Sequence, residues 1–540
     1  MMSGVPPRAS IDGWPVDART WSLALNTLLL SGAACAVSVP VGSGLAWLLV
    51  RSDLPGRRAG AVVVGLMLFV PLYLHAAAWQ AGFGGLGWYT LAAESKAWLS
   101  GWTGAIWVHT LAGVPWVVLI VGAGLWLVEP ELEEQALLDG SPGQVFFRVT
   151  LRSAAPAVGV AAVWVAITTA GEMAASDLFV VRTYAEEIYT RFQFGPRLGE
   201  GPLSLAPGVL LTGGLVLGGV WLCTRLLPAG RPITLARRHV FELGRWRWPL
   251  AALVAAALLL LVAVPMGNLG YKAGIKVTEV GAERVREWSP LKMLAMVGAA
   301  PWRYRRELGW SLSIGALAAT AAVALATLLG WFAQRGAWLS GKRLLNHGES
   351  PRTALRGATL ALAAFCLAVP GPLIGLGLIA ALNRPEVPGL AWLYNRSILA
   401  PWLALSIRAF PLAVLVMWHA LRTVPREMLD AAAVDGAGSL GRLVRVAIPN
   451  RLAALGLAWV VGMAVALGDL AASVMVLPPG VDTLSRRIFG LLHSGQEAEV
   501  SGICLALVLL FGAVALLAGW LAVRWGRRAA AGGSRTLDRV

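Results

Sequence analysis

Acidic side chains inside apolar segments are the residues of this chain best suited to handling a charged solute. Glu172, Asp177 and Asp469 each lie near the end of a long apolar run. A charge inside a membrane helix costs at least ~2.5 kcal/mol, so such residues usually face a cavity or a partner. Two interpretations stay open. The carboxylates line a pathway, where their oxygens would hold a cation transiently, or they cap helix ends that break after Gly171 and Gly468.

The other residue types that do chemistry are present without the patterns that chemistry requires. Arg408 lies inside an apolar run and needs an acidic partner that the sequence does not identify. The six histidines are scattered without zinc-like spacing. Segment 336–342 fits most of a phosphate-binding loop, but Arg343 follows where Ser or Thr should reach magnesium. The four cysteines lie in apolar runs, which indicates packing. We therefore expect no catalytic residue, metal site or cofactor in this chain.

Composition indicates that a membrane surrounds these residues. Of the 540 residues 57% are hydrophobic and 14% are charged, against roughly 45–50% and 25% in average proteins. The mean hydropathy is +0.68. A soluble protein of this length and a disordered chain are both excluded. The net charge of +16 indicates basic loops that face anionic lipid rather than a nucleic-acid partner.

Apolar runs long enough to cross a bilayer recur along the whole chain. About 20 apolar residues span a membrane as a helix. We predict an all-α integral membrane protein with about 11 transmembrane helices, within a range of 10–12. The expected spans are 21–50, 60–79, 105–128, 154–177, 206–226, 249–266, 308–333, 357–382, 398–421, 453–476 and 500–523.

The distribution of basic residues predicts the orientation of these spans. Loops that carry more Lys and Arg tend to stay inside. The strongest cluster lies in 225–247, and the segment 524–540 is also basic. Both fall on the same side when eleven spans are counted. We therefore expect the N-terminus outside, the C-terminus in the cytoplasm, and the plasma (inner) membrane as the location.

Two loops of the chain repeat one pattern. The first acidic loop (129–153) reads Glu-Gln-Ala-Leu-Leu-Asp-Gly over 134–140, and the second acidic loop (422–452) reads Asp-Ala-Ala-Ala-Val-Asp-Gly over 430–436. Gly171-Glu172 and Gly468-Asp469 follow at nearly the same spacing. Pro425 and Glu427 favour the start of a short helix. Gly140 and Gly436 are expected to end the two helices in the left-handed conformation.

The repeated pattern divides the chain into two parallel halves. We predict a first repeat over 1–226, a basic linker with an extra span and an outside segment over 227–307, a second repeat over 308–523, and a basic tail over 524–540. Five spans in each repeat would invert the second copy. The extra span at 249–266 restores its orientation, so both acidic loops should lie on the same, cytoplasmic side.

The two acidic loops resemble the EAA motif of ABC-transporter permeases of the binding-protein-dependent importer class. The resemblance implies that each loop helix docks onto a cytoplasmic ATPase. Departures from the motif are Gln135 for the first alanine, Asp430 for glutamate, and Arg152 where the second loop has Pro449. The residues that carry the resemblance, together with the aspartates beside the glycines, are Glu134, Ala136, Asp139, Gly140, Asp430, Ala431, Ala432, Asp435 and Gly436.

The resemblance extends to double-length permeases of ferric-iron importers, with thiamine and phosphonate importers as relatives. It implies two copies of an ABC ATPase that carry the ATP and magnesium, an extracytoplasmic solute-binding protein, and a chain that does no chemistry itself. Ferric iron is the expected substrate, and thiamine, phosphonate or another small solute are alternatives. A secondary transporter with parallel repeats is the alternative from another class, but it gives no reason for two equivalent acidic loops.

Overall fold

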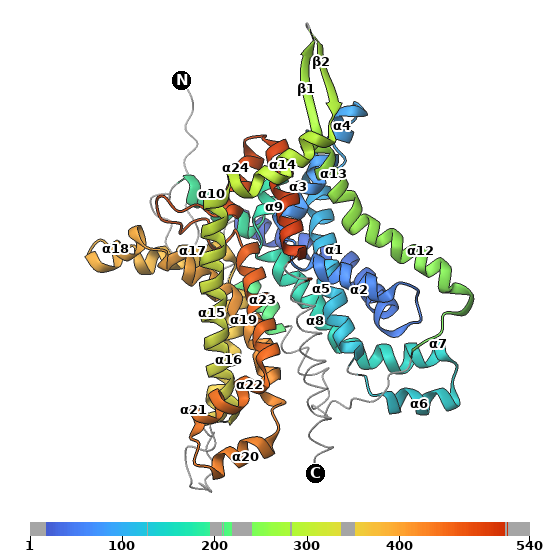
Figure 1. Ribbon diagram of the computed structural model, residues 1–540, viewed down its shortest axis with the longest axis vertical. Helices are drawn as coiled ribbons and strands as arrows, with labels where there is room; N and C mark the ends of the chain where they lie inside the picture. The colour runs from blue at the N-terminus through green and yellow to red at the C-terminus, as the bar shows by residue number, and fades with distance from the viewer. Residues whose placement is uncertain are drawn as a thin grey trace.

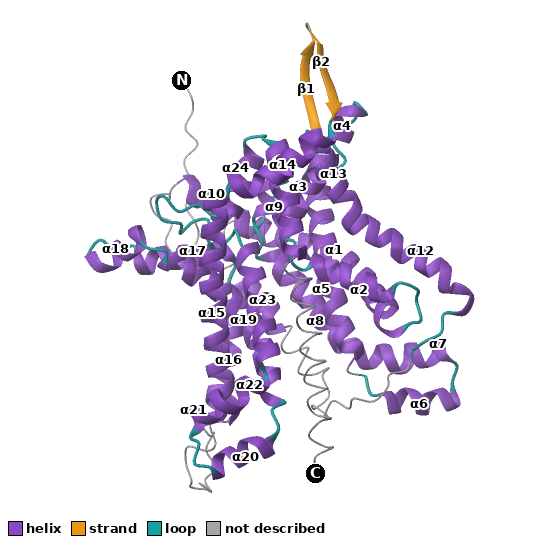
Figure 2. Ribbon diagram, in the orientation of Figure 1, coloured by secondary structure: helices purple, strands orange, loops and turns teal. Residues whose placement is uncertain are grey.

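The computed structural model describes residues 18–126, 128–194, 208, 210–218, 240–280, 283–335, 351–513 and 516. Helices predominate within these residues, and their two strands form one hairpin (Figure 1, Figure 2). The all-α class predicted from the sequence is confirmed. Six of the described helices are long and apolar enough to cross a membrane, or up to nine if each of three bent helix pairs counts as one span.

Three long helices form the centre of the first half. α1 packs most extensively against α5, and both contact α8. The approach of α1 to α5 is close because Gly42 presents only a hydrogen to Val117, as is common where membrane helices touch. The helices of this half are α1 (Ala18–Arg51), α2 (Arg57–Met67), α3 (Leu72–Phe83), α4 (Trp88–Ala92), α5 (Gly101–Trp126), α6 (Pro130–Asp139), α7 (Pro142–Val145), η1 (Phe146–Thr150), α8 (Leu151–Ala170), α9 (Ala174–Leu178) and α10 (Tyr184–Phe194).

The second half packs its helices in the same order. α15 packs against α19, and α23 contacts both. Gly462 on α23 lies against Ala319 and Ala409, so small residues again let the helices meet. The elements are α15 (Arg305–Arg335), α16 (Pro351–Ala368), α17 (Gly371–Leu382), α18 (Pro388–Arg396), α19 (Leu399–Arg422), α20 (Arg426–Val434), α21 (Ser439–Arg442), η6 (Leu443–Ala447), α22 (Ile448–Asn450), α23 (Leu452–Gly468) and α24 (Leu484–His493), followed by helical residues 497–513.

A helical segment and a hairpin join the halves. Residues 244–274 form one membrane-length helical stretch, which contains the expected span 249–266 and packs on α2 and α3. The antiparallel hairpin pairs Ile275 with Trp288 at its base and projects away from the helices (Figure 1). The joining elements are η3 (Gly244–Trp246), α12 (Arg247–Leu258), η4 (Leu259–Ala263), α13 (Val264–Gly274), β1 (Ile275–Val280), β2 (Glu283–Trp288) and α14 (Pro290–Arg303).

Two expected straight spans are broken at proline. The span 60–79 is split into α2 and α3 with a bend of 102°, and the span 357–382 into α16 and α17 with a bend of 106°. Pro71 and Pro370 have extended ψ angles of 153° and 144° and precede the second helix of each pair. Proline has no N–H to donate and disfavours a helical residue before it. The continuous spans were therefore the wrong prediction at both places.

Other boundaries of the expected spans also shift. α8 ends at Ala170 and α23 at Gly468, so residues 171–177 and 469–476 are not continuations of these helices. The expected spans 206–226 and 500–523 lie partly outside the described residues. The count of eleven therefore stays a prediction, while a multi-pass helical membrane protein is established by the six to nine candidate spans.

The halves contact each other at their breaks. The position of a Cβ on Gly171 would be 3.7 Å from the Cα of Pro370, and that of a Cβ on Gly468 would be 3.6 Å from the Cβ of Pro71. Each half thus places its proline break against the glycine that ends the other half's long helix. The tyrosine hydroxyl of Tyr73 adds a hydrogen bond of 3.4 Å to the carbonyl of Leu467.

Candidate functional site

The helices of the two acidic loops, α6 and α20, lie at the same end of the molecule, opposite the hairpin (Figure 1). α6 begins at Pro130 with Glu131 and Glu133 in its first turn, where negative charge suits the helix dipole. α20 follows Pro425 and has Glu427 in its first turn. Each short helix is followed by a second short helix and a π-helical turn. In the first loop this turn leads directly into the long helix α8, whereas in the second loop α22 and a bend of 82° precede α23.

The residues that resemble the EAA motif lie mostly on exposed parts of these helices. Glu134 and Asp139 in α6 are exposed, and Ala136 and Gly140 are half-buried. In the second acidic loop Ala432 is half-buried, and the remaining residues named from the motif are exposed, namely Asp430, Ala431, Asp435 and Gly436. Within the described chain no ion pair involves any of these acids. Their surfaces are therefore available to a partner.

The last turn of each loop helix also presents an apolar side chain that sequence analysis missed. Leu138 is 85% exposed and Val434 is 88% exposed. They occupy equivalent places, one residue before Asp139 and Asp435. An isolated exposed apolar residue is common, but an equivalent pair at one end of the molecule indicates a contact surface. The signal was in the repeat itself, since both loops carry a large apolar residue at this position.

The two glycines that follow these aspartates differ in backbone conformation. Gly436 has φ +83°, and Ala437 N–H donates to the carbonyl of Ala432 at 2.9 Å, as in a helix that ends in a left-handed residue. Gly140 has φ −141° and ψ 157°, so the predicted left-handed turn is wrong there. The first acidic loop is one residue shorter, and Ser141 begins a capping box with Gln144 immediately afterwards, which requires an extended link.

A buried ion pair anchors the first acidic loop to the long helices. The Arg51 guanidinium at the end of α1 pairs with the carboxylate of Glu133 on α6, and their side chains are 1% and 0% exposed. Thr150 donates to the other Glu133 oxygen at 2.6 Å. Arg51 also donates to the carbonyl of Leu125 at 3.3 Å. Because the charges and most of their hydrogen-bonding atoms are matched, burial of this pair is tolerated.

Apolar packing takes the same place in the second acidic loop. Leu429 and Ala447 are 5% and 0% exposed and occupy the positions equivalent to Glu133 and Thr150. They belong to one cluster with Trp331, Met417 and Leu421. The indole N–H of Trp331 donates to the Ser439 hydroxyl at 3.0 Å. The two loops therefore have similar backbones and different anchors.

The candidate pathway acid Glu172 caps a helix in the first half. Its carboxylate accepts hydrogen bonds from the backbone N–H groups of Ala174 and Ala175 at 2.7 Å and 3.0 Å, at the start of α9. The His109 ring nitrogen lies 3.6 Å away. This arrangement satisfies backbone donors that a broken helix would leave without partners.

Asp469 takes the same capping place and adds an ion pair. It accepts from the N–H of Ala472 at 2.8 Å, and its other oxygen pairs with the Nε of Arg408 on α19 at 2.7 Å. The acidic partner that Arg408 needs is therefore Asp469. No contact joins Glu172 to Asp469 among the described contacts, and no three His, Cys, Asp or Glu side chains of the described residues gather as a metal site.

The third acid, Asp177, joins the two halves at the end of the molecule opposite the acidic loops. Its carboxylate lies 2.9 Å from the Nε2 of His493 on α24. The hydrogen bond to Asp177 raises the pKa of His493 above its usual value, although burial lowers it. The Tyr189 and Phe489 rings meet edge to face nearby, with centroids 6.0 Å apart. α10 and α24 are amphipathic helices outside the membrane-spanning set, so these contacts connect the halves where the long helices end.

Comparison with known proteins agrees with these features. The profile of the family described as "Binding-protein-dependent transport system inner membrane component" matches residues 337–530, which include the second acidic loop. The molybdenum transport system permease protein ModB of Escherichia coli (strain K12) is 30% identical over 185 residues, covering 32% of this chain and 80% of that protein.

Two further relatives are named for other substrates. The putrescine transport system permease protein PotI of Escherichia coli (strain K12) is 26% identical over 222 residues, 40% of this chain and 72% of that protein. The putative 2-aminoethylphosphonate transport system permease protein PhnV of Salmonella paratyphi A is 26% identical over 145 residues, 26% and 52%. The multi-pass helical fold and these matches agree, and the chain belongs to the inner-membrane permeases of binding-protein-dependent ABC importers.

Proposed function

We propose that this single chain supplies both halves of an import pathway and couples each half to one of two cytoplasmic ABC ATPase subunits. The supporting observation is the pair of acidic loops at one end of the molecule (Figure 1), each with an exposed apolar residue at the same position. In this proposal 1–226 and 308–523 are parallel repeats, and α6 and α20 dock onto the ATPases. The ATP and magnesium are bound by the ATPases, and a solute-binding protein delivers the substrate to the opposite end.

The anchoring of the loops supports the coupling role. Glu133 ties α6 to the end of α1, and Leu429 packs α20 against α15 and α19. A docking helix held this way would carry a displacement directly into the long helices, because packed interiors transmit movement. The proline breaks, which contact the opposite half, would pass that movement to the centre. Alternating access would follow as one half moves against the other.

Replacement of Leu138 and Val434 by glutamate tests the docking. These side chains are exposed, so the permease should fold and insert normally, whereas a charge at each apolar contact should prevent docking. We expect the double variant to lose copurification with the ATPase and ATP-driven uptake in proteoliposomes. The control is Leu132→Glu, which changes another exposed leucine on α6, away from its last turn, and should keep both. Normal copurification of the double variant would reject the proposal.

Two candidate substrates are proposed. Ferric iron is the substrate suggested by the resemblance of the sequence, and an oxyanion is the second candidate because two relatives are named for molybdenum and 2-aminoethylphosphonate. Arg408 beside Asp469 favours the second, since this acid already has a cationic partner. Uptake of radioactive iron and of molybdate, measured with the cognate binding protein, decides between them. The orientation, with the N-terminus outside, is tested by labelling cysteines placed at Ser3 and Ser534.

A further inference from the structure

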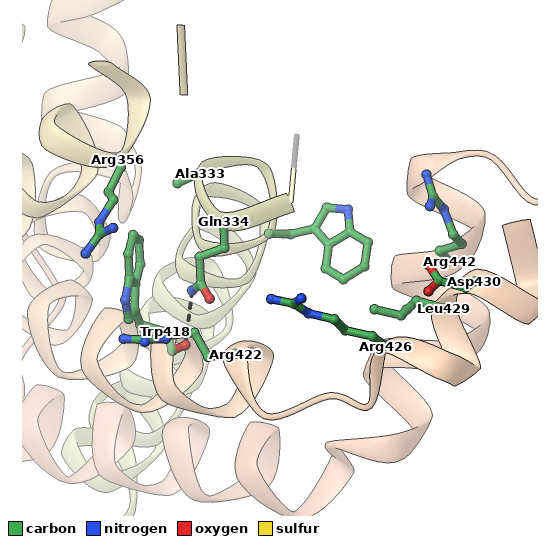
Figure 3. Close-up of a pocket in the computed structure, with 10 residues that line it drawn as sticks. Ala333, Gln334, Arg356, Trp418, Arg422, Arg426, Leu429, Asp430 and Arg442 are labelled. Atoms are coloured by element: carbon green, nitrogen blue, oxygen red, sulfur yellow. Dashed lines mark hydrogen bonds between the residues drawn. The ribbon is translucent and has the colours of Figure 1, made fainter. Parts of the chain in front are cut away.

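A cavity of about 680 Å³ lies beside the second acidic loop. It is bounded by the ends of the long helices α15 and α19, the start of α16, and the short helices α20 and α21 (Figure 3). Among the described residues that line it are four arginines, Trp418 and one acid, Asp430. The four arginines are Arg356, Arg422, Arg426 and Arg442, which come from four different helices.

Three of these arginines have no partner in the described part of the chain. Arg356, Arg422 and Arg426 are exposed, and none of the three forms a hydrogen bond or an ion pair with another described residue. Figure 3 shows Arg426 extending from α20 across the cavity toward α15. Like charges on Arg356, Arg422 and Arg426 repel one another across this hollow, and Asp430 is the single acid among the described residues that line it.

In the first half an acid on the loop helix neutralises a basic residue at the end of a long helix. There Arg51 at the end of α1 is paired with Glu133 of α6 inside the protein. The residue equivalent to Glu133 in the second half is Leu429, which is buried and apolar. The first half therefore carries its own anion between the loop helix and the long helices, and the second half has arginines around a cavity instead.

We propose that this cavity binds the phosphate-type oxyanion of a ligand, supplied by the headgroup of an anionic phospholipid. Planar guanidinium groups bind two oxygens of a phosphate at once. Arg356 and Arg422 lie at the ends of long apolar helices, where the headgroups of the membrane would be, and Trp418 supplies an indole typical of that depth. Anionic lipid concentrates on the cytoplasmic face. The bound group would join α20 to α16 and α19, as Glu133 joins α6 to α1.

The test measures binding to the purified full chain, without transport. Native mass spectrometry counts phosphatidylglycerol molecules retained against phosphatidylcholine, and thermal unfolding is followed with either lipid or with inorganic phosphate. A ligand that binds only the folded chain raises the Tm. The variant is Arg422→Gln with Arg426→Gln. The matched control is Arg148→Gln with Arg445→Gln, which removes two exposed charges from the acidic loops away from the cavity.

We expect the wild type and the control to retain phosphatidylglycerol. The cavity variant should bind it at least about tenfold more weakly, because two guanidinium groups that form charge-assisted hydrogen bonds are removed. A Tm rise with inorganic phosphate as well would support the site and identify a soluble oxyanion as a second source. Equal retention by all three proteins would overturn the proposal. Absence of saturable binding to the wild type would also overturn it, whether or not the variant folds.

This inference rests on the proposed function only in placing α20 at the cytoplasmic side. The two can fail separately. Loss of ATPase copurification in the Leu138 and Val434 variant leaves lipid retention unchanged, because neither side chain lines the cavity. Conversely, equal lipid retention by the wild type and by the Arg422 and Arg426 variant would overturn the lipid site. The docking of α6 and α20 would still stand, because it is tested with the Leu138 and Val434 variant.

Discussion

The two acidic loops are anchored to the long helices by different kinds of side chain. Both hold a short helix against the ends of long helices at the same end of the molecule (Figure 1). The first uses the buried Arg51–Glu133 pair with Thr150, and the second uses Leu429 and Ala447. A buried pair depends on both partners being present, whereas an apolar contact is less directional. We therefore expect single substitutions in the Arg51–Glu133 pair to destabilise the first loop. We expect the stability of the second loop to depend on the ligand proposed for the neighbouring cavity.

The largest expected effect comes from breaking the buried pair. Glu133→Gln leaves the Arg51 charge buried without a carboxylate, so we expect a loss of about 3–5 kcal/mol in the free energy of unfolding. Thermal and denaturant unfolding in detergent measures it. Glu131→Gln, an exposed change in the first turn of α6, is the control and should cost less than about 1 kcal/mol.

The apolar anchor of the second loop can also be built into the first loop. Arg51→Met, Glu133→Leu and Thr150→Ala together give the first loop the apolar anchor of the second. Replacement of a whole buried ion pair by packed apolar residues is often neutral or stabilising, so we expect the triple variant to be more stable than Glu133→Gln alone. If the triple variant were as unstable as the single one, the two anchors would not be interchangeable.

Replacement by valine of the two glycines that follow the loop helices should have unequal effects on coupling. Gly436 has φ +83°, and a β-branched residue there costs at least ~1 kcal/mol and displaces the end of α20. We expect Gly436→Val to insert normally and to uncouple ATP hydrolysis from uptake. Gly140 has φ −141°, which any residue adopts, so Gly140→Val adds no backbone strain and should disturb coupling less. Its Cβ would lie 3.3 Å from the Ala136 carbonyl oxygen, a close contact that a shift of a few tenths of an ångström would relieve. Equal losses of uptake per hydrolysed ATP would contradict this difference.

Neutralising Glu172 and neutralising Asp469 should lower the Tm by different amounts. Asp469→Asn removes the carboxylate opposite Arg408, and an unpaired charge in a membrane span costs at least ~2.5 kcal/mol. Glu172→Gln keeps an oxygen that can accept one of its two backbone hydrogen bonds. We expect the first variant to lower the Tm more than the second. Uptake per assembled complex, measured for the variant with both substitutions, separates a pathway role from a capping role. Normal uptake at a lowered Tm would show that the two acids only cap backbone groups and do not line a pathway.

The smallest effect is expected at the contact between the halves. Asp177 raises the pKa of His493 above its usual 6.5, so the folded protein binds this proton more tightly than the unfolded chain. The stabilisation is present in full below about pH 6.5 and is lost as the pH rises through the raised pKa. His493→Gln should remove this part of the pH dependence of the Tm. His493 is 45% exposed, so the change should be small, and an unchanged pH profile would contradict it.

Much of the candidate site was predictable because its signals are local. Apolar runs predict helices in a membrane, and the repeated Glu/Asp and Asp-Gly pattern predicted a short helix in each loop, which the structure has as α6 and α20. The end of α20 at Gly436 follows from a glycine that tolerates a left-handed turn. The breaks at Pro71 and Pro370 also had a local signal, but the hydropathy of the surrounding runs outweighed it in the expected spans.

Tertiary structure decided what depends on residues far apart in the chain. Arg51 meets Glu133, Arg408 meets Asp469 and Asp177 meets His493 only because whole helices pack in one way. The sequence showed the acids and the arginine without their partners, since composition and periodicity carry no information on which helices touch. The extended Gly140 depends on the capped helix that begins beside it. The arginine cavity likewise arises where five helices meet, and no single segment of the sequence contains it.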